Sequence, residues 1–183
     1  MKKVILIGDS ITLSYRGKVK SYLENKAEVS YPAENARWSG FTYNSLRHWM
    51  PGLPEHPDVI HWNNGIWDCA HLYEDNAPFS SIEVYLHYIR KTYELLKSTG
   101  ATVIFATSTP PWKNQRVHDE DIVAYNKAAV DMLKAEGCII DDLYSVVAKD
   151  LENYIIDGDG VHLTDDGINE CAKTVSQLIE KYL

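Results

Sequence analysis

The sequence predicts an α/β protein, a three-layer α/β/α sandwich built on a parallel sheet of five strands. Short apolar runs rich in β-branched residues alternate with segments of helical periodicity along the whole chain. In addition, polar and glycine-containing segments follow the predicted strands, where parallel sheets carry their ligand-binding loops. No internal repeat, linker or low-complexity tract interrupts this pattern, so we predict a single domain over residues 1–183.

Five segments have the composition of strands. The first, residues 4–7, is a continuous aliphatic run, which is typical of a strand buried on both faces of a sheet. Gly8, Asp9 and Ser10 follow it directly and indicate a sharp turn. The other predicted strands are shorter or lie further along the chain, at residues 27–31, 59–62, 102–107 and 138–140.

Helices are predicted between these strands. Ser80 and Glu83 have the spacing of a capping box, and the helix that they open is expected to stop before Gly100. A second helix is expected over about residues 119–136, and a third begins after Thr164, its predicted N-cap. The first of these carries apolar residues at helical spacing: Ile82, Tyr85, Leu86, Ile89, Tyr93 and Leu96.

Composition limits the classes of partner. The formal net charge of −8 argues against a nucleic acid or an anionic membrane, so we expect a small-molecule substrate. The four-residue apolar run near the start is too short for a signal peptide. Cys69, Cys138 and Cys171 are odd in number and widely spaced, which favours free thiols. We therefore predict a cytoplasmic protein, and leave its oligomeric state open.

Ser10 and a distant Asp159-x-x-His162 motif provide the parts of a nucleophilic hydrolase. A serine hydroxyl needs a base to take its proton, and a histidine oriented by a carboxylate is the usual one. Ser10 alone could instead cap a helix, and Asp159 could belong to an acidic turn with an incidental histidine. Calcium-loop and dinucleotide-binding patterns do not fit this turn, because the required ligand and glycine positions are missing.

Backbone amides and asparagine side chains are candidates for stabilising an oxyanion. Ser10 would project at a helix N-terminus, and Gly40 lacks the Cβ that would hinder its amide from approaching a ligand. Asn63 and Asn64 follow the third predicted strand and could donate through their side chains. Each of these residues could equally serve only to form a turn.

Together these segments resemble the SGNH hydrolases, also called the GDSL lipase/esterase family. The matching segments are Gly8-Asp9-Ser10, Ser39-Gly40-Phe41-Thr42 and Asp159-x-x-His162, and Asn35 also fits by its spacing from Gly40. The resemblance implies a flavodoxin-like SGNH hydrolase fold and assigns Ser10 as nucleophile, His162 as base and Asp159 as its orienting carboxylate. It also implies that the amides of Ser10 and Gly40 are oxyanion donors.

The third block departs from the family pattern Gly-x-Asn-Asp. This chain has Gly65-Ile66-Trp67-Asp68, so Trp67 stands where the family has an oxyanion-donating asparagine. Trp67 could donate only through its indole N–H. We expect Asn63 to replace the missing donor, with Asn64 as the alternative, because strand alternation turns Asn63 to the same side as Trp67.

We predict a serine esterase that hydrolyses short, acetyl-type esters, with O-acetylated saccharides as the candidate substrates. Loops with aromatic and amide side chains suit a sugar better than a long acyl chain. No cofactor is required, and His61, His71 and His118 show no metal-ligand spacing on a helix, so no metal site is predicted. A lysophospholipase- or thioesterase-type acylhydrolase and a weakly active or inactive ligand-binding member are the alternatives. Five residues are expected to contact substrate: Asp9, Asn35, Trp67, Trp112 and Arg116.

Overall fold

The computed structural model describes all 183 residues and has one parallel five-stranded sheet at its centre. The strand order is β2-β1-β3-β4-β5, which is the flavodoxin-like order. Val4 of β1 pairs with Val29 on β2 and with Val59 on β3, so the first strand lies inside the sheet. The strands are β1 (Lys2–Ile7), β2 (Ala27–Ser30), β3 (Val59–Asn63), β4 (Thr102–Ala106) and β5 (Ile139–Asp141).

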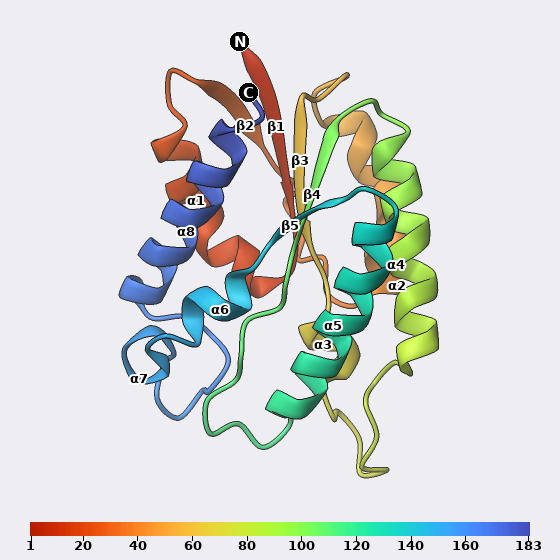
Figure 1. Cartoon of the computed structure of the whole chain (residues 1–183), viewed down its shortest axis with the longest axis vertical. Coiled ribbons are helices and arrows are strands. Elements are labelled where there is room, and N and C mark those ends of the chain that lie inside the picture. The colour runs from red at the N-terminus through yellow and green to blue at the C-terminus, as the bar shows by residue number, and fades with distance from the viewer.

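Helices cover both faces of the sheet, which confirms the predicted three-layer sandwich (Figure 1). One layer consists of α1 (Ser10–Tyr22), α6 (Leu143–Val147), α7 (Leu151–Tyr154) and α8 (Asp165–Glu180). The opposite layer consists of α2 (Ser39–Trp49), the 3₁₀ helix η1 (Met50–Gly52), α3 (Ile66–Cys69), α4 (Ile82–Lys97) and α5 (Asp119–Ala135). None of these helices combines the length and the apolarity needed to cross a membrane.

Burial in the core explains why the strands are apolar runs in the sequence. The side chains of residues 4–7 are almost completely buried, because α1 and α8 cover one face of β1 while the other layer covers the second face. Trp62 of β3 packs edge-to-face on Phe105 of β4, with ring centroids 4.9 Å apart. The whole apolar core forms one contiguous cluster, and this cluster holds the carboxyl ends of the strands in register.

Helix starts agree with the sequence except at the start of α4. Thr164 caps α8 as predicted, since its side chain accepts a hydrogen bond from the Gly167 amide. The cap of α4 is Ser81 rather than Ser80, because the backbone N–H of Ser80 instead donates to the carbonyl of Asp68. That bond holds Ser80 in the preceding loop and moves the helix start by one residue.

Candidate active site

Ser10 is the first residue of α1 and directly follows the turn that leaves β1. Asp9 caps the helix, and its Oδ1 accepts the Ile11 amide at 3.0 Å. This removes the alternative in which Ser10 itself is the cap, and leaves the Ser10 hydroxyl available for another partner. Because Ser10 lies in the first helical turn, its amide is one of those without an acceptor inside the helix.

His162 lies next to Ser10 although the two residues are at opposite ends of the chain. Its Nε2 is 3.0 Å from the Ser10 Oγ, and its Nδ1 is 3.0 Å from both carboxylate oxygens of Asp159. If Nδ1–H donates to the carboxylate, Nε2 is left as the acceptor for the serine proton. The structure therefore brings the three predicted side chains into one continuous hydrogen-bonded chain.

The turn that carries Asp159 and His162 is fixed by its own backbone. Asp159 Oδ1 accepts the amides of Val161 at 2.9 Å and of His162 at 2.6 Å. Gly160 has a φ of +74°, and a Cβ there would lie 2.4 Å from the carbonyl oxygen of Trp112. The turn can therefore close on the neighbouring loop only with glycine at position 160.

The electrostatics of this turn favour an ionised Asp159. Its partial burial tends to raise the pKa, but the amide and the ring of His162, together with the Val161 amide, outweigh that effect. The pKa of Asp159 consequently lies below its usual value. A charged carboxylate at Nδ1 would stabilise the imidazolium that forms when His162 accepts a proton.

An open cavity of about 450 Å³ adjoins these three side chains. Trp67 and Arg116, both predicted to contact substrate, contribute to its wall. The cavity lies at the carboxyl ends of the strands, in agreement with the expected position of the active-site loops. Its lining comprises Ser10, Ile66, Trp67, Ala70, Leu72, Lys113, Asn114, Gln115, Arg116, Val117, Gly158, Asp159, Val161 and His162.

Gly40 occupies the second position of α2, and the start of that helix is held by Asp68. The buried Asp68 carboxylate accepts the Ser39 amide at 2.8 Å and the Ser39 hydroxyl at 2.6 Å. A Cβ at Gly40 would lie 2.3 Å from the ring of Trp38, so only glycine fits there. Gly40 itself does not line the cavity.

Asn63 and Asn64 are both buried at the end of β3, and neither lines the cavity. The Asn64 side chain is engaged at both ends, since its Oδ1 accepts from Trp62 Nε1 and its Nδ2 donates to the Arg37 carbonyl. Asn63 Nδ2 donates one hydrogen to the Ala106 carbonyl at 2.9 Å. Asn63 Oδ1 has no hydrogen-bond partner. The Asn63 side chain is therefore held at one end only, and the Asn64 side chain at both.

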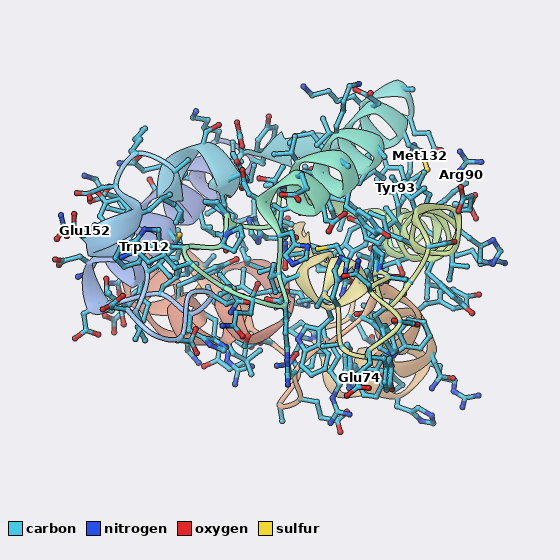
Figure 2. All side chains as sticks on the ribbon, turned by 90° about the horizontal axis from the view of Figure 1, so that it is seen from below. Glu74, Arg90, Tyr93, Trp112, Met132 and Glu152 are labelled. Carbon is cyan, nitrogen blue, oxygen red and sulfur yellow. The ribbon has the colours of Figure 1, made fainter.

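Asp9, Asn35 and Trp112, which the sequence predicts to contact substrate, do not line this cavity. Asp9 is fully buried beneath the site, because its carboxylate is needed to cap α1. Asn35 Oδ1 accepts the Arg37 amide and forms a turn of the second loop. Trp112 lies on the side of the molecule that carries Glu152 (Figure 2), where its amide donates to the Gly160 carbonyl at 2.8 Å.

Asn114 is a cavity residue that the sequence reasoning missed. Its Oδ1 accepts the amides of Arg116 and Val117, both at 2.8 Å, and its Nδ2 donates to the Asp159 carbonyl at 2.8 Å. The Asn114 side chain therefore links the cavity wall to the Asp159 turn. Its place in a Pro-Pro-containing loop indicated a turn, but no local pattern pointed to Asp159 as its partner.

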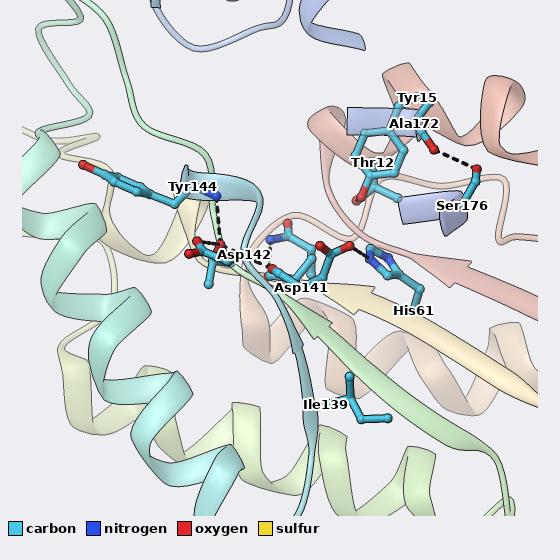
Figure 3. A network of polar contacts seen from close by, with 12 residues as sticks. Thr12, Tyr15, His61, Ile139, Asp141, Asp142, Tyr144, Ala172 and Ser176 are labelled. Atoms are coloured by element: carbon cyan, nitrogen blue, oxygen red, sulfur yellow. Dashed lines mark hydrogen bonds and ion pairs between the residues drawn. The ribbon is translucent and has the colours of Figure 1, made fainter. Parts of the chain in front are cut away.

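A buried polar network lies under the site, at the carboxyl ends of β3, β4 and β5 (Figure 3). His61 is fully buried, and its Nε2 is 3.0 Å from Asp141 Oδ2. Thr107 joins β4 to the next loop, because its Oγ1 accepts the Tyr144 amide at 2.9 Å. These contacts make His61 part of the core and fix the strand ends from which the site loops depart.

A family model described as the GDSL-like lipase/acylhydrolase family matches residues 6–168. The chain belongs to this family. The match confirms the family expected from the three motifs, and with it the predicted class of enzyme, a carboxylic ester hydrolase. No curated protein sequence matches the chain.

Solved structures of GDSL-type and related esterases have the same fold as this GDSL-family chain. An acetyl xylan esterase, AlAXEase, aligns with a TM-score of 0.80 and 18% identity, over 97% of this chain and 99% of that one. Axe2, an acetylxylan esterase from Geobacillus stearothermophilus, aligns with a TM-score of 0.82 and 16% identity, over 97% and 94%. A lipase/acylhydrolase from Enterococcus faecalis has a TM-score of 0.79 and 18% identity, over 99% and 96%. At these sequence identities, the comparison shows that the folds are alike and does not show the substrate.

Proposed function

We propose that this GDSL-family chain is a serine esterase that removes short acyl groups, of the acetyl class, from saccharides. The observation that carries this proposal is the hydrogen-bonded chain from Ser10 through His162 to Asp159 at the edge of an open cavity. Spacings of 3.0 Å at both histidine nitrogens are within the range required for proton transfer.

In the first half-reaction, Ser10 Oγ attacks the carbonyl carbon of the ester while His162 Nε2 takes the hydroxyl proton. The carbonyl π electrons move onto oxygen and form a tetrahedral oxyanion. Collapse of this intermediate breaks the bond to the alcohol oxygen, which receives the proton from His162 and leaves. Water then attacks the acyl-serine by the same steps and releases the acid and free Ser10.

The oxyanion requires several donors, and we propose the amides of Ser10 and Gly40 together with the Asn63 side chain. Both amides belong to the first turns of long helices, α1 and α2, where N–H groups lack helical acceptors and the helix dipole favours negative charge. Asn63 is chosen over Asn64 because its side chain is held only through Nδ2 and can turn more easily, whereas the Asn64 side chain is held at both ends.

The wall of the cavity supports a short acyl group and a polar leaving group. The wall combines apolar side chains, such as Ile66 and Leu72, with one continuous polar stretch over residues 113–116. The apolar part can hold a short acyl group, and the polar stretch is a poor environment for a long alkyl chain. Trp67, a residue that is 36% exposed, lines the cavity together with Ser10, and an aromatic ring at such a position can pack on the apolar side of a sugar ring. The two acetyl xylan esterases of the same fold add support for this substrate class.

We propose that the protein acts in the reducing cytoplasm. Cys69, Cys138 and Cys171 are free and buried, and burial raises the pKa of all three thiols, so none is suited to disulfide exchange. The net charge of −8 supports a small, uncharged or weakly charged substrate over a polyanion.

The proposal is tested by initial rates on p-nitrophenyl acetate, butyrate and octanoate, and by acetate release from an acetylated xylo-oligosaccharide. Ser10→Ala and His162→Ala are each expected to lower kcat by about 10³ or more. Ser14→Ala is the matched control, because Ser14 is exposed one turn further along α1 and bonds only to the Ile11 carbonyl.

A rate that peaks at acetyl and requires Ser10 supports the proposal, and acetate release from the oligosaccharide supports the substrate class. A peak at octanoate would instead favour a lipase- or thioesterase-type acylhydrolase. Equal activity in the wild type and Ser10→Ala would overturn the role of Ser10. An absence of turnover on every ester would favour a ligand-binding member of the family.

A further inference from the structure

Three potential metal ligands from two segments meet behind the cavity wall. His71 follows α3, while His118 and Asp121 belong to the start of α5. His71 Nε2 is 2.9 Å from Asp121 Oδ2, and His118 Nδ1 is 3.6 Å from the same oxygen. All three ligand atoms lie within 4.8 Å of one another. The imidazole rings of His71 and His118 lie 4.3 Å apart between centroids, with their planes tilted by 40°.

The hydrogen bonding of His118 leaves a lone pair directed at this group. Its Nε2 is 3.2 Å from the carbonyl oxygen of Gln115, which accepts only, so Nε2 carries the hydrogen. In the neutral ring, Nδ1 then presents a lone pair to the Asp121 carboxylate, and two acceptors face each other. A backbone carbonyl on the second nitrogen is also the usual outer partner of a histidine that binds a metal. A cation between Nδ1 and Oδ2 would satisfy both atoms.

Two imidazole nitrogens and one carboxylate oxygen are a ligand set for a zinc-like divalent transition metal. Calcium and magnesium prefer oxygen ligands throughout. Zinc–nitrogen and zinc–oxygen bonds of about 2.0–2.2 Å place tetrahedral ligand atoms about 3.4 Å apart, so side-chain shifts of roughly 1 Å close the site. The three side chains are between 13% and 33% exposed, which leaves a solvent-facing position for water.

We propose that His71, His118 and Asp121 bind one zinc-class divalent ion, and that this ion cross-links the two segments of the cavity wall. Ala70 and Leu72 flank His71, and Val117 precedes His118, and all three neighbours line the cavity. The His71 amide already donates to the Arg116 carbonyl at 2.7 Å. A bound ion would add a second connection between the segments, outside the Ser10–His162–Asp159 chain.

The test is a titration of the chelator-treated protein with ZnCl₂ by isothermal calorimetry, with the thermal midpoint and the Co²⁺ absorption spectrum as independent readouts. The wild type is expected to bind one equivalent and to unfold at a higher temperature when loaded. His118→Ala and Asp121→Asn are each expected to weaken zinc binding tenfold or more. His118 is one-third exposed, so His118→Ala is expected to fold, and an unchanged metal-free thermal midpoint verifies this.

Two control variants separate this site from other histidines. His87→Ala removes an exposed histidine of α4, and His162→Ala removes the only histidine that lines the cavity, so both are expected to bind zinc like the wild type. No saturable zinc binding by the wild type would overturn the proposal. Binding that survives His118→Ala and Asp121→Asn, or that is lost in His162→Ala, would overturn it as well. Ester hydrolysis is not a readout here, so failure of the proposed function and failure of the metal site are distinguishable.

Discussion

Asp68 of α3 accepts both the backbone amide and the hydroxyl of Ser39, at 2.8 and 2.6 Å, and thereby fixes the start of α2. The helix start carries the Gly40 amide, which we propose as an oxyanion donor. Burial raises the pKa of Asp68 to about 6, and the two Ser39 bonds lower it only in part. Asp68, the Asp of the third block, therefore holds the start of α2, although Trp67 stands where the family pattern has Asn.

We expect Asp68→Ala to lower both stability and activity. The change leaves the buried Ser39 amide and hydroxyl without an acceptor, which should lower the free energy of unfolding by an amount on the order of 3 kcal/mol. Ser39→Ala removes only one of the two bonds and should cost about 1 kcal/mol. Denaturant unfolding and kcat/KM on p-nitrophenyl acetate measure the two effects. Asp131→Ala, at an exposed position of α5, is the control, and equal effects of Asp68→Ala and Asp131→Ala would contradict the anchoring role.

Asp9 should make the protein less stable as pH rises from about 4 to 6. Burial raises its pKa to about 6, and this outweighs the Ile11 amide and the nearby His162, which lower it. An unfolded Asp titrates near 3.9, so the native state binds more protons in this window and the free energy of unfolding falls with rising pH.

Asp9→Asn should flatten that decline. The asparagine Oδ1 still accepts the Ile11 amide, but the side chain cannot ionise. The free energy of unfolding should therefore fall between about pH 4 and 6 by roughly 2–3 kcal/mol less than in the wild type. Urea denaturation at several pH values measures it. Asp131→Asn, at an exposed position, should keep the wild-type dependence on pH. If Asp9→Asn also keeps it, the pKa of Asp9 is not raised in the native state.

The third oxyanion donor is distinguished by comparing Asn63→Ala with Trp67→Phe. If Asn63 donates, its removal should lower kcat by about 10²–10³ with little change in KM, while Trp67→Phe, which keeps a ring but no N–H, should retain most activity. Asn44→Ala, on the exposed face of α2, is the control. The reverse ranking of the two variants would assign the role to the Trp67 indole.

The Asn114–Asp159 tether should matter for activity more than for stability. Asn114→Asp keeps an oxygen acceptor for the Arg116 and Val117 amides but loses the Nδ2–H that holds the Asp159 carbonyl. Freed of this bond, the turn can shift Asp159 and His162, and we expect kcat to fall by roughly 10- to 100-fold. The thermal midpoint and kcat are measured together, with Asn44→Asp as control. A lower thermal midpoint with unchanged kcat would indicate a purely structural role.

The sequence by itself determined the sheet, the layers and the parts of the candidate site. A continuous aliphatic run such as residues 4–7, followed by a turn signal, is typical of a strand covered on both faces. The periodicity of residues 82–96 is typical of a helix that buries one side. The Gly-Asp-Ser turn and the Asp-x-x-His motif are local patterns, so their residues could be named without any tertiary contact.

Only the tertiary structure decided which side chains face the cavity and which support it from behind. Asp9 belongs to a family motif but is buried as a helix cap, whereas Asn114 belongs to no motif and joins the cavity wall to the Asp159 turn. His71 and Asp121, far apart in the sequence, come together because the loop after α3 packs on the start of α5. Such contacts depend on how loops from different strands pack at one edge of the sheet, and local sequence patterns do not predict that packing.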